Sequence, residues 1–284
     1  MIERVAVIGA GTMGNGIAQS LAVGGFTVEL VDAAQEGLAR GVEALEANLQ
    51  TGVERGKLSA DEARAARERI NTALDPGAAA AAQLVIEAVP ENLGLKHAVF
   101  RELEEICSSD TIFATNTSAL SITEIAASVK NPARVIGMHY FNPAHIMQLV
   151  EIVRGLETAD RAVEVATEVA SRSGKNTVLI NEAPGFITTR INALIGNEAF
   201  YMLQEGVASA RDIDKAIKLG LNHPMGPFEM VDLVGLDTRL KILQYLHSTL
   251  GEMYRPCPLL VKFVNAGRLG RKTGRGVYDY PNGK

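Results

Sequence analysis

Three glycines in the pattern G-x-G-x-x-G follow the first apolar segment of the chain. Residues 2–8 are short, apolar and β-branched, which predicts a buried strand, and residues 12–23 carry apolar side chains at helical spacing. Between a strand and a helix, the first glycine permits a tight turn, the second admits a phosphate close to the backbone, and the third lets the helix pack on the strand. The positive end of the helix then faces the phosphate. We therefore predict a dinucleotide site formed by Gly9, Ala10, Gly11, Thr12, Met13 and Gly14.

An acidic residue ends the second predicted strand, residues 26–31. Asp32 lies 18 residues after Gly14, and the residues that follow it include no nearby arginine. A carboxylate here accepts hydrogen bonds from ribose hydroxyls and repels a 2′-phosphate, which favours NAD over NADP. The alternative is that Asp32 only caps the next helix.

Strand and helix patterns alternate over the first two thirds of the chain. Such alternation predicts a mostly parallel, Rossmann-type doubly wound sheet with helices on both faces. Strands are expected at 2–8, 26–31, 82–89, 111–114, 134–140, 149–153 and 176–180. Helices are expected at 12–23, 33–53, 59–70, 93–107, 121–128 and 159–173.

The pattern changes near Glu182-Ala183-Pro184, where we place a domain boundary. Beyond it, only helical segments are evident until Val277, at about 186–206, 211–219, 227–250 and 256–267. The prediction is an α/β domain over residues 1–183 followed by a smaller all-α C-terminal domain over residues 184–284.

Composition narrows the class of protein. Of 284 residues, 47% are hydrophobic and 21% are charged, and the net charge is −5, which disfavours general binding to nucleic acids or membrane surfaces. Cys107 and Cys257 have no metal-type or C-x-x-C spacing, so we expect reduced thiols and no metal site. No apolar run is long enough for a membrane span, and the N-terminus lacks a secretory pattern, so we expect a cytoplasmic protein.

One histidine stands out among five. His139 ends a predicted strand, and strand ends of such a sheet point at the cofactor crevice, whereas His97, His223 and His247 lie in predicted helices or a turn. A histidine can take the proton of a substrate hydroxyl near neutral pH. Glu151 is an acid within an apolar strand and is costly to bury unless it is paired, so a His139–Glu151 pair is expected. His145 remains the rival base.

Ser118 follows another strand end, in Asn116-Thr117-Ser118. Its hydroxyl could bond a substrate oxygen or the cofactor, or it could simply cap the helix that follows. The sequence contains no nucleophile elbow, zinc-type spacing or P-loop.

Taken together, these motifs resemble the L-3-hydroxyacyl-CoA dehydrogenases, including the short-chain 3-hydroxybutyryl-CoA type. The resemblance runs over essentially the whole chain. It rests on Gly9–Gly14, Glu87–Asn92, Asn116–Ser118, His139–Pro143 with Glu151, Pro184–Phe186, His223–Pro227, Val234–Asp237 and Gly270–Gly276.

The resemblance implies an NAD-dependent, reversible oxidation of an L-3-hydroxyacyl-CoA to a 3-oxoacyl-CoA. His139 would be the general base, Glu151 its partner, and Ser118 a contact of the substrate 3-oxygen and the nicotinamide, with Asn142 lining the nicotinamide site. It also implies an acyl-CoA substrate bound in a cleft between the domains, and a homodimer formed through the C-terminal domain.

Further contacts follow from the same resemblance. Glu91, Lys96 and Lys272 would contact the cofactor. Arg55 and Lys57, in the long helical insertion, would pair with coenzyme A phosphates, or would be solvated surface cations.

The chain departs from the family pattern at Thr189, where asparagine commonly precedes the arginine of the Pro-Gly-Phe block. Threonine offers a shorter side chain without an amide carbonyl, so one hydroxyl would replace the amide in that substrate contact. Two alternatives to the main hypothesis remain, namely a dehydrogenase of a non-CoA hydroxy acid and a non-catalytic NAD-binding protein.

Overall fold

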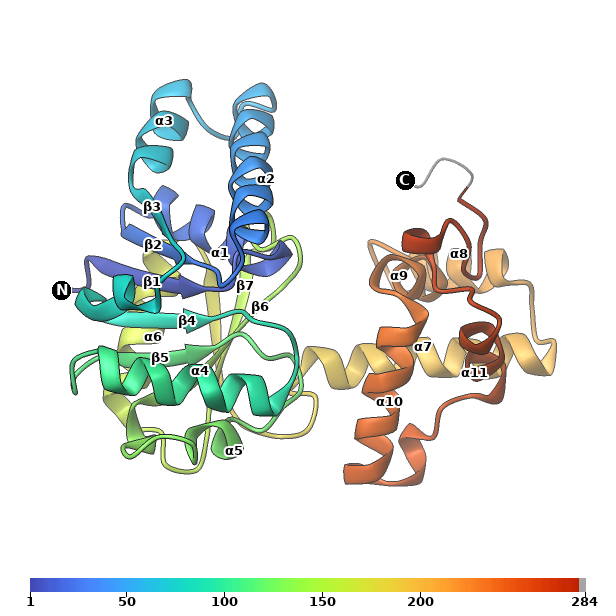
Figure 1. Ribbon diagram of the computed structural model, residues 1–284. Helices are drawn as coiled ribbons and strands as arrows, with labels where there is room; N and C mark the ends of the chain where they lie inside the picture. Colours follow the sequence, from blue (N-terminus) through green and yellow to red (C-terminus); the bar gives the residue numbers. More distant parts are fainter. Residues whose placement is uncertain (281–284) are drawn as a thin grey trace. The chain divides into compact units, whose positions relative to one another are not determined.

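A computed structural model describes residues 1–280 (Figure 1). The chain divides into two compact units, one comprising Met1–Ala183 and one that begins at Pro184. Each unit is described by itself. No helix within residues 1–280 combines the length and apolar character needed to cross a membrane.

The first unit is built on a single eight-stranded sheet. Its strands are β1 (Arg4–Ile8), β2 (Thr27–Val31), β3 (Ile70–Ala73), β4 (Leu84–Glu87), β5 (Ile112–Thr115), β6 (Val135–Tyr140), β7 (Leu149–Arg154) and β8 (Asn176–Asn181). The strand order is β3-β2-β1-β4-β5-β6-β7-β8, and only the β6–β7 pair is antiparallel. The order reverses between β1 and β4, and the crevice beyond the strand ends at such a point is where this fold binds ligands.

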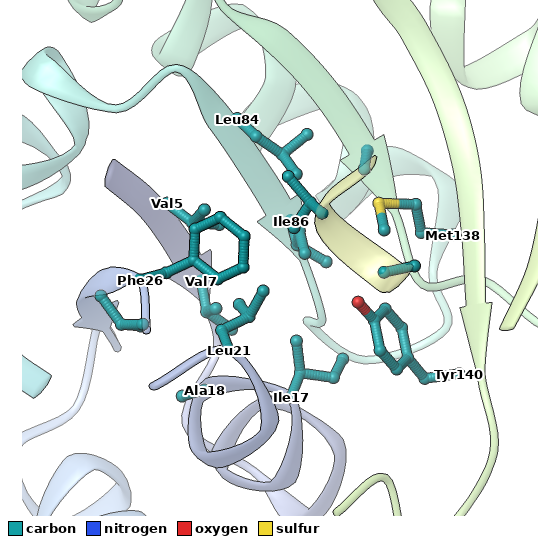
Figure 2. Packing of buried hydrophobic residues seen from close by; sticks show 14 of the residues in the cluster. Val5, Val7, Ile17, Ala18, Leu21, Phe26, Leu84, Ile86, Met138 and Tyr140 are labelled. Atoms are coloured by element: carbon teal, nitrogen blue, oxygen red, sulfur yellow. The ribbon is translucent and has the colours of Figure 1, made fainter. Parts of the chain in front are cut away.

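Helices cover both faces of the sheet, which confirms the predicted doubly wound fold. They are α1 (Thr12–Val23), α2 (Gln35–Glu54), α3 (Ala60–Glu68), α4 (Leu93–Ile106), α5 (Ile122–Ala126) and α6 (Asp160–Arg172). On one face, alternate residues of β1 and β4 pack against Ile17, Ala18 and Leu21 of α1 (Figure 2). On the other face, Phe100 of α4 meets Phe113 of β5 edge-on, with ring centroids 5.8 Å apart.

One strand was not predicted. The helix expected over 59–70 ends at Glu68, and Ile70 begins β3, which pairs in parallel with β2. The segment Ile70-Asn71-Thr72-Ala73 is too polar for a buried-strand pattern, because it lies at the edge of the sheet and exposes Asn71 and Thr72.

The α2–α3 insertion forms a pair of helices beside the β3 edge (Figure 1). Ser59 begins α3 with a reciprocal capping box, in which its hydroxyl accepts from the Glu62 amide and its own amide donates to the Glu62 carboxylate. Arg67 of α3 bonds Glu46 of α2 at 2.7 Å and ties the two helices together.

The second unit is helical, as predicted. Its helices are α7 (Thr188–Glu205), α8 (Ala210–Gly220), α9 (Pro227–Val234), α10 (Leu236–Leu250) and α11 (Pro258–Asn265). The single helix expected over 227–250 is wrong, because Gly235, at φ +104°, ends α9 and begins α10. The signal near Val277 corresponds to isolated bridges of Arg275 with Gly270 and Asp279, not to a strand.

Candidate active site

The glycine loop has a different requirement at each glycine. Gly9 has φ +102°, and a Cβ there would lie 2.8 Å from the carbonyl oxygen of Ala88. A Cβ at Gly14 would lie only 1.7 Å from the carbonyl oxygen of Gly9, whereas one at Gly11 would meet no atom within 4 Å. The packing of the protein backbone therefore requires glycine at positions 9 and 14, whether or not a ligand is bound. Gly11 faces open space at the N-terminus of α1, which fits the approach of a pyrophosphate.

Asp32 lies at the end of β2, directly beside this loop. Its Oδ2 accepts from the Ala10 amide at 2.8 Å, and its Oδ1 accepts from the Ala34 amide at 3.0 Å. The carboxylate therefore holds the glycine loop and also orders the start of α2. It is only partly buried, so its remaining acceptor capacity suits ribose hydroxyls. These residues fit an NAD-type dinucleotide.

His139 and Glu151 form a buried pair. They face each other in the antiparallel register of β6 and β7, and Nδ1 of His139 lies 2.6 Å from Oε2 of Glu151. The histidine is 5% exposed and the glutamate is 0% exposed. A buried carboxylate without a cationic or donor partner is strongly disfavoured, so this pairing fixes the imidazole orientation with Nδ1 as the donor. The predicted pair is present.

His145, the rival base, has a different environment. Burial and the positive charge of Lys175 lower its pKa below the usual 6.5. No carboxylate partner is found for His145 within residues 1–280. Lys175 itself is buried, and its ammonium donates to the carbonyl oxygens of Ala144 at 2.6 Å and Met147 at 2.9 Å. This lysine therefore fixes the segment that follows β6.

Asn142 belongs to that segment. It lies two residues beyond the end of β6 and is exposed, and the Asn142–Pro143 peptide bond is cis. The segment is also held on α1, because Ser20 donates to the Ala144 carbonyl at 3.3 Å. The structure thus connects the residues after His139 to the helix that begins at the glycine loop.

Ser118 lies at the end of β5 and is bound to Glu91. The Glu91 Oε1 atom accepts from the Ser118 amide at 3.1 Å, from the Ser118 hydroxyl at 3.5 Å and from the Thr117 hydroxyl at 2.5 Å. Thr117 Oγ1 in turn accepts from the Leu120 amide at 3.0 Å. Thr117 thus orders the turn after β5, and α5 is capped by Ser121, whose hydroxyl accepts from the Glu124 amide at 3.1 Å. Ser118 remains partly exposed beyond the carboxyl end of β5.

Lys96 does not lie on the surface. It is 1% exposed, and its ammonium bonds both oxygens of Glu87, at 2.7 and 2.9 Å, and lies 3.4 Å from Oε2 of Glu91. Glu87, which is fully buried, also accepts from the Thr115 hydroxyl and the Val89 amide. Sequence reasoning quoted Glu87 in a motif but missed its place in the site. The signal in the sequence was that Glu87 ends an apolar strand pattern, much as Glu151 interrupts one, and a buried acid needs a partner.

The remaining predicted residues lie elsewhere. Arg55 and Lys57 are exposed at the C-terminal end of α2 and the turn after it. Thr189 and Lys272 belong to the second unit, where Lys272 forms an ion pair with Asp237 at 2.6 Å. The first unit therefore places Gly9–Gly14 and Asp32 after β1 and β2, and Glu91, Ser118 and His139 at or beyond the carboxyl ends of β4, β5 and β6. Glu151 joins them from the first half of the antiparallel strand β7, opposite His139.

Comparison with known proteins identifies the family. Residues 4–183 match the family model described as the NAD-binding domain of 3-hydroxyacyl-CoA dehydrogenase, and residues 185–280 match that of its C-terminal domain. The chain belongs to the 3-hydroxyacyl-CoA dehydrogenase family. It is therefore an NAD-dependent oxidoreductase, as predicted.

Similar proteins cover this family member from end to end. A probable 3-hydroxybutyryl-CoA dehydrogenase of Bacillus subtilis strain 168 is 46% identical over 98% of both chains. A 3-hydroxyadipyl-CoA dehydrogenase of Escherichia coli K12 is 44% identical, over 98% of this chain and 59% of its own length. The crystal structure of an (S)-3-hydroxybutyryl-CoA dehydrogenase from Ralstonia eutropha matches with a TM-score of 0.95 and 41% identity, over 99% of both chains.

Proposed function

We propose that this protein catalyses the reversible, NAD-dependent oxidation of an L-3-hydroxyacyl-CoA, with 3-hydroxybutyryl-CoA as the representative substrate, to the 3-oxoacyl-CoA. The observation that carries the proposal is the buried His139–Glu151 pair, on the same side of the sheet, at the carboxyl ends of the parallel strands, as the glycine loop and Ser118. The names of the relatives support a short acyl chain.

In this proposal His139 is the general base. Its Nδ1 is engaged by Glu151, so Nε2 is the nitrogen that takes the hydroxyl proton of the substrate. The imidazolium that results is buried at a site where the Glu151 carboxylate already lies 2.6 Å away. A fixed negative charge in a dry environment stabilises that cation as it forms, without reorganisation of solvent. Glu151 also fixes the tautomer that leaves Nε2 able to accept.

Bound NAD supplies the acceptor for the hydride that leaves C3 of the substrate. The role of the chain is to hold the reacting groups in place. Ser118, held by the hydrogen bond that its backbone amide donates to the Glu91 carboxylate, would donate its hydroxyl to the substrate 3-oxygen. Asn142 would offer its side-chain amide to the nicotinamide side of the site. Fixing these donors before the substrate binds lowers the entropic part of the barrier.

The coenzyme A end of the substrate would be recognised by charge. Arg55 and Lys57 are exposed cations, and within the described residues neither has a carboxylate partner. They are therefore available to phosphates. Thr189, in the second unit, would replace the usual asparagine contact with a single hydroxyl. A homodimer formed through the second unit also belongs to this proposal, and sedimentation equilibrium would test it.

Two oxidants of NADH test the proposed substrate class. Acetoacetyl-CoA should be reduced with a kcat/KM at least about a hundredfold above that of free acetoacetate, because only the thioester carries groups for Arg55 and Lys57 to bind. Arg55→Ala/Lys57→Ala should raise the KM for acetoacetyl-CoA and leave that for acetoacetate unchanged. Equal activity with both compounds would instead assign the enzyme to non-CoA hydroxy acids.

A further inference from the structure

Three charged side chains form one network at the carboxyl ends of β4 and β5. Lys96 lies between Glu87 and Glu91, and the lysine and Glu87 are 1% and 0% exposed. Two carboxylates and one ammonium give the network a formal charge of −1. Glu87 alone would neutralise Lys96, and so the second carboxylate, Glu91, is not balanced within the network.

The network lies next to the proposed cofactor crevice. The Ala88 amide, one residue beyond Glu87, donates to the Ile8 carbonyl, and a Cβ at Gly9 would lie 2.8 Å from the Ala88 carbonyl oxygen. Glu91 in turn binds Ser118 through the amide and the hydroxyl. The excess negative charge is therefore fixed between the glycine loop and the residue proposed to contact the nicotinamide. Glu87 and Lys96 are buried, whereas the Glu91 side chain is 40% exposed, so solvent and salt partly screen its charge.

Oxidised and reduced nicotinamide differ in charge at this place, since the oxidised ring is a cation and the reduced ring is neutral. We propose that the Glu87–Lys96–Glu91 network makes the protein discriminate between the two redox forms, with Glu87 as the positioning residue that neutralises Lys96 and keeps the net charge at −1. A site with that charge binds NAD⁺ more tightly, relative to NADH, than a neutral site does. The inference rests on the proposed function.

Glu87→Gln tests the charge with little change in shape. The carbonyl of the introduced glutamine can keep the bonds that Oε1 accepts from Val89 and Lys96. Its amide, in place of Oε2, can donate to Thr115, whose hydroxyl is able to turn and accept, while Lys96 loses its second bond to this side chain. The network then has no net charge. The ratio Kd(NADH)/Kd(NAD⁺), measured by calorimetry and by NADH fluorescence, should fall about tenfold, as expected for one unit charge about 10 Å away at an effective dielectric constant of about 20.

A second variant restores the charge by another route. Lys96→Met alone would leave Glu87 buried without its cation and is expected to fold poorly. The double variant Glu87→Gln/Lys96→Met removes both buried charges and leaves Glu91, so the ratio should return to within about threefold of wild type. Thermal melting verifies that each variant is folded.

Glu104→Gln is the matched control. Glu104 lies on the same helix as Lys96, about 12 Å further along, and forms a largely buried ion pair with Arg134 at 3.0 Å. Its loss should leave the ratio unchanged. An unchanged ratio in Glu87→Gln, or a double variant that behaves like Glu87→Gln, would overturn the inference and leave the proposed function standing. Failure of the wild type to bind either form would overturn both.

Discussion

The two glycines Gly11 and Gly14 should respond in opposite ways to the same added methyl group. At Gly14, the Cβ of alanine would lie 1.7 Å from a backbone oxygen, more than 1 Å short of the 3.0 Å that real Cβ atoms keep. Backbone must move, and we expect a loss of about 3 kcal/mol or more. At Gly11 the φ of −62° and ψ of −171° suit any L-residue, and no atom lies within 4 Å. Gly11→Ala should leave the stability of the apoprotein unchanged or raise it by about 0.5 kcal/mol.

Thermal melting with and without NAD separates the two effects. Gly14→Ala should lower the apoprotein Tm by about 6 °C or more, at about 2–4 °C per kcal/mol for domains of this size. Gly11→Ala should keep the Tm within about 2 °C of wild type yet weaken NAD binding at least tenfold, about 1.4 kcal/mol. The methyl group fills the space that we assign to the pyrophosphate. Normal NAD affinity in Gly11→Ala, or a Gly14→Ala protein as stable as wild type, would refute the reasoning.

Three further predictions concern two acidic residues, Glu151 and Asp232, and one histidine, His145. Glu151→Gln should lower kcat by about 10²- to 10⁴-fold with little change in NADH affinity, and steady-state rates with NADH titrations will show whether affinity falls instead. Burial and Lys175 lower the pKa of His145 in the folded protein, so as the pH falls the unfolded chain takes up a proton on this histidine before the folded protein does. The free energy of unfolding should therefore rise with pH up to about 6.5. Urea denaturation at a series of pH values tests this, and a His145→Gln variant whose unfolding free energy depends on pH as steeply as that of wild type would contradict it. Asp232→Asn keeps one carbonyl oxygen, which can still accept from the Val277 amide, but replaces the oxygen that accepts from the Tyr278 amide and the Tyr280 hydroxyl, and it should cost about 2 kcal/mol in the same assay.

Most of the fold follows from local patterns. The strands β1, β4 and β6 are buried on both faces and are therefore continuous apolar runs, which sequence reveals directly. The edge strand β3 has no such run, since only Ile70 is buried there. The break at Gly235 interrupts a helical periodicity that continues on both sides of it. Only the backbone conformation of that glycine distinguishes α9 and α10 from one long helix.

The site was predictable where strand order alone brings residues together. His139 and Glu151 lie on adjacent strand patterns, so their pairing follows from an antiparallel neighbour and from the cost of burying an unpaired acid. For Lys96, the family resemblance implies a contact with the cofactor, but nothing in the local sequence indicates that this lysine is buried. Its burial depends on Glu87, nine residues earlier on another element, and on the Thr115 and Val89 donors that complete the pocket. Partners that come together from different elements to neutralise a buried charge leave no periodic pattern in a sequence.

The central claim is that His139 takes the substrate proton, and single-turnover kinetics of His139→Gln test it most directly. With saturating NAD and (S)-3-hydroxybutyryl-CoA, the rate of NADH formation should fall at least about a thousandfold, while NADH binding and the Tm remain close to those of wild type. Near-normal turnover by this folded variant would contradict the account and would return His145 as the candidate base.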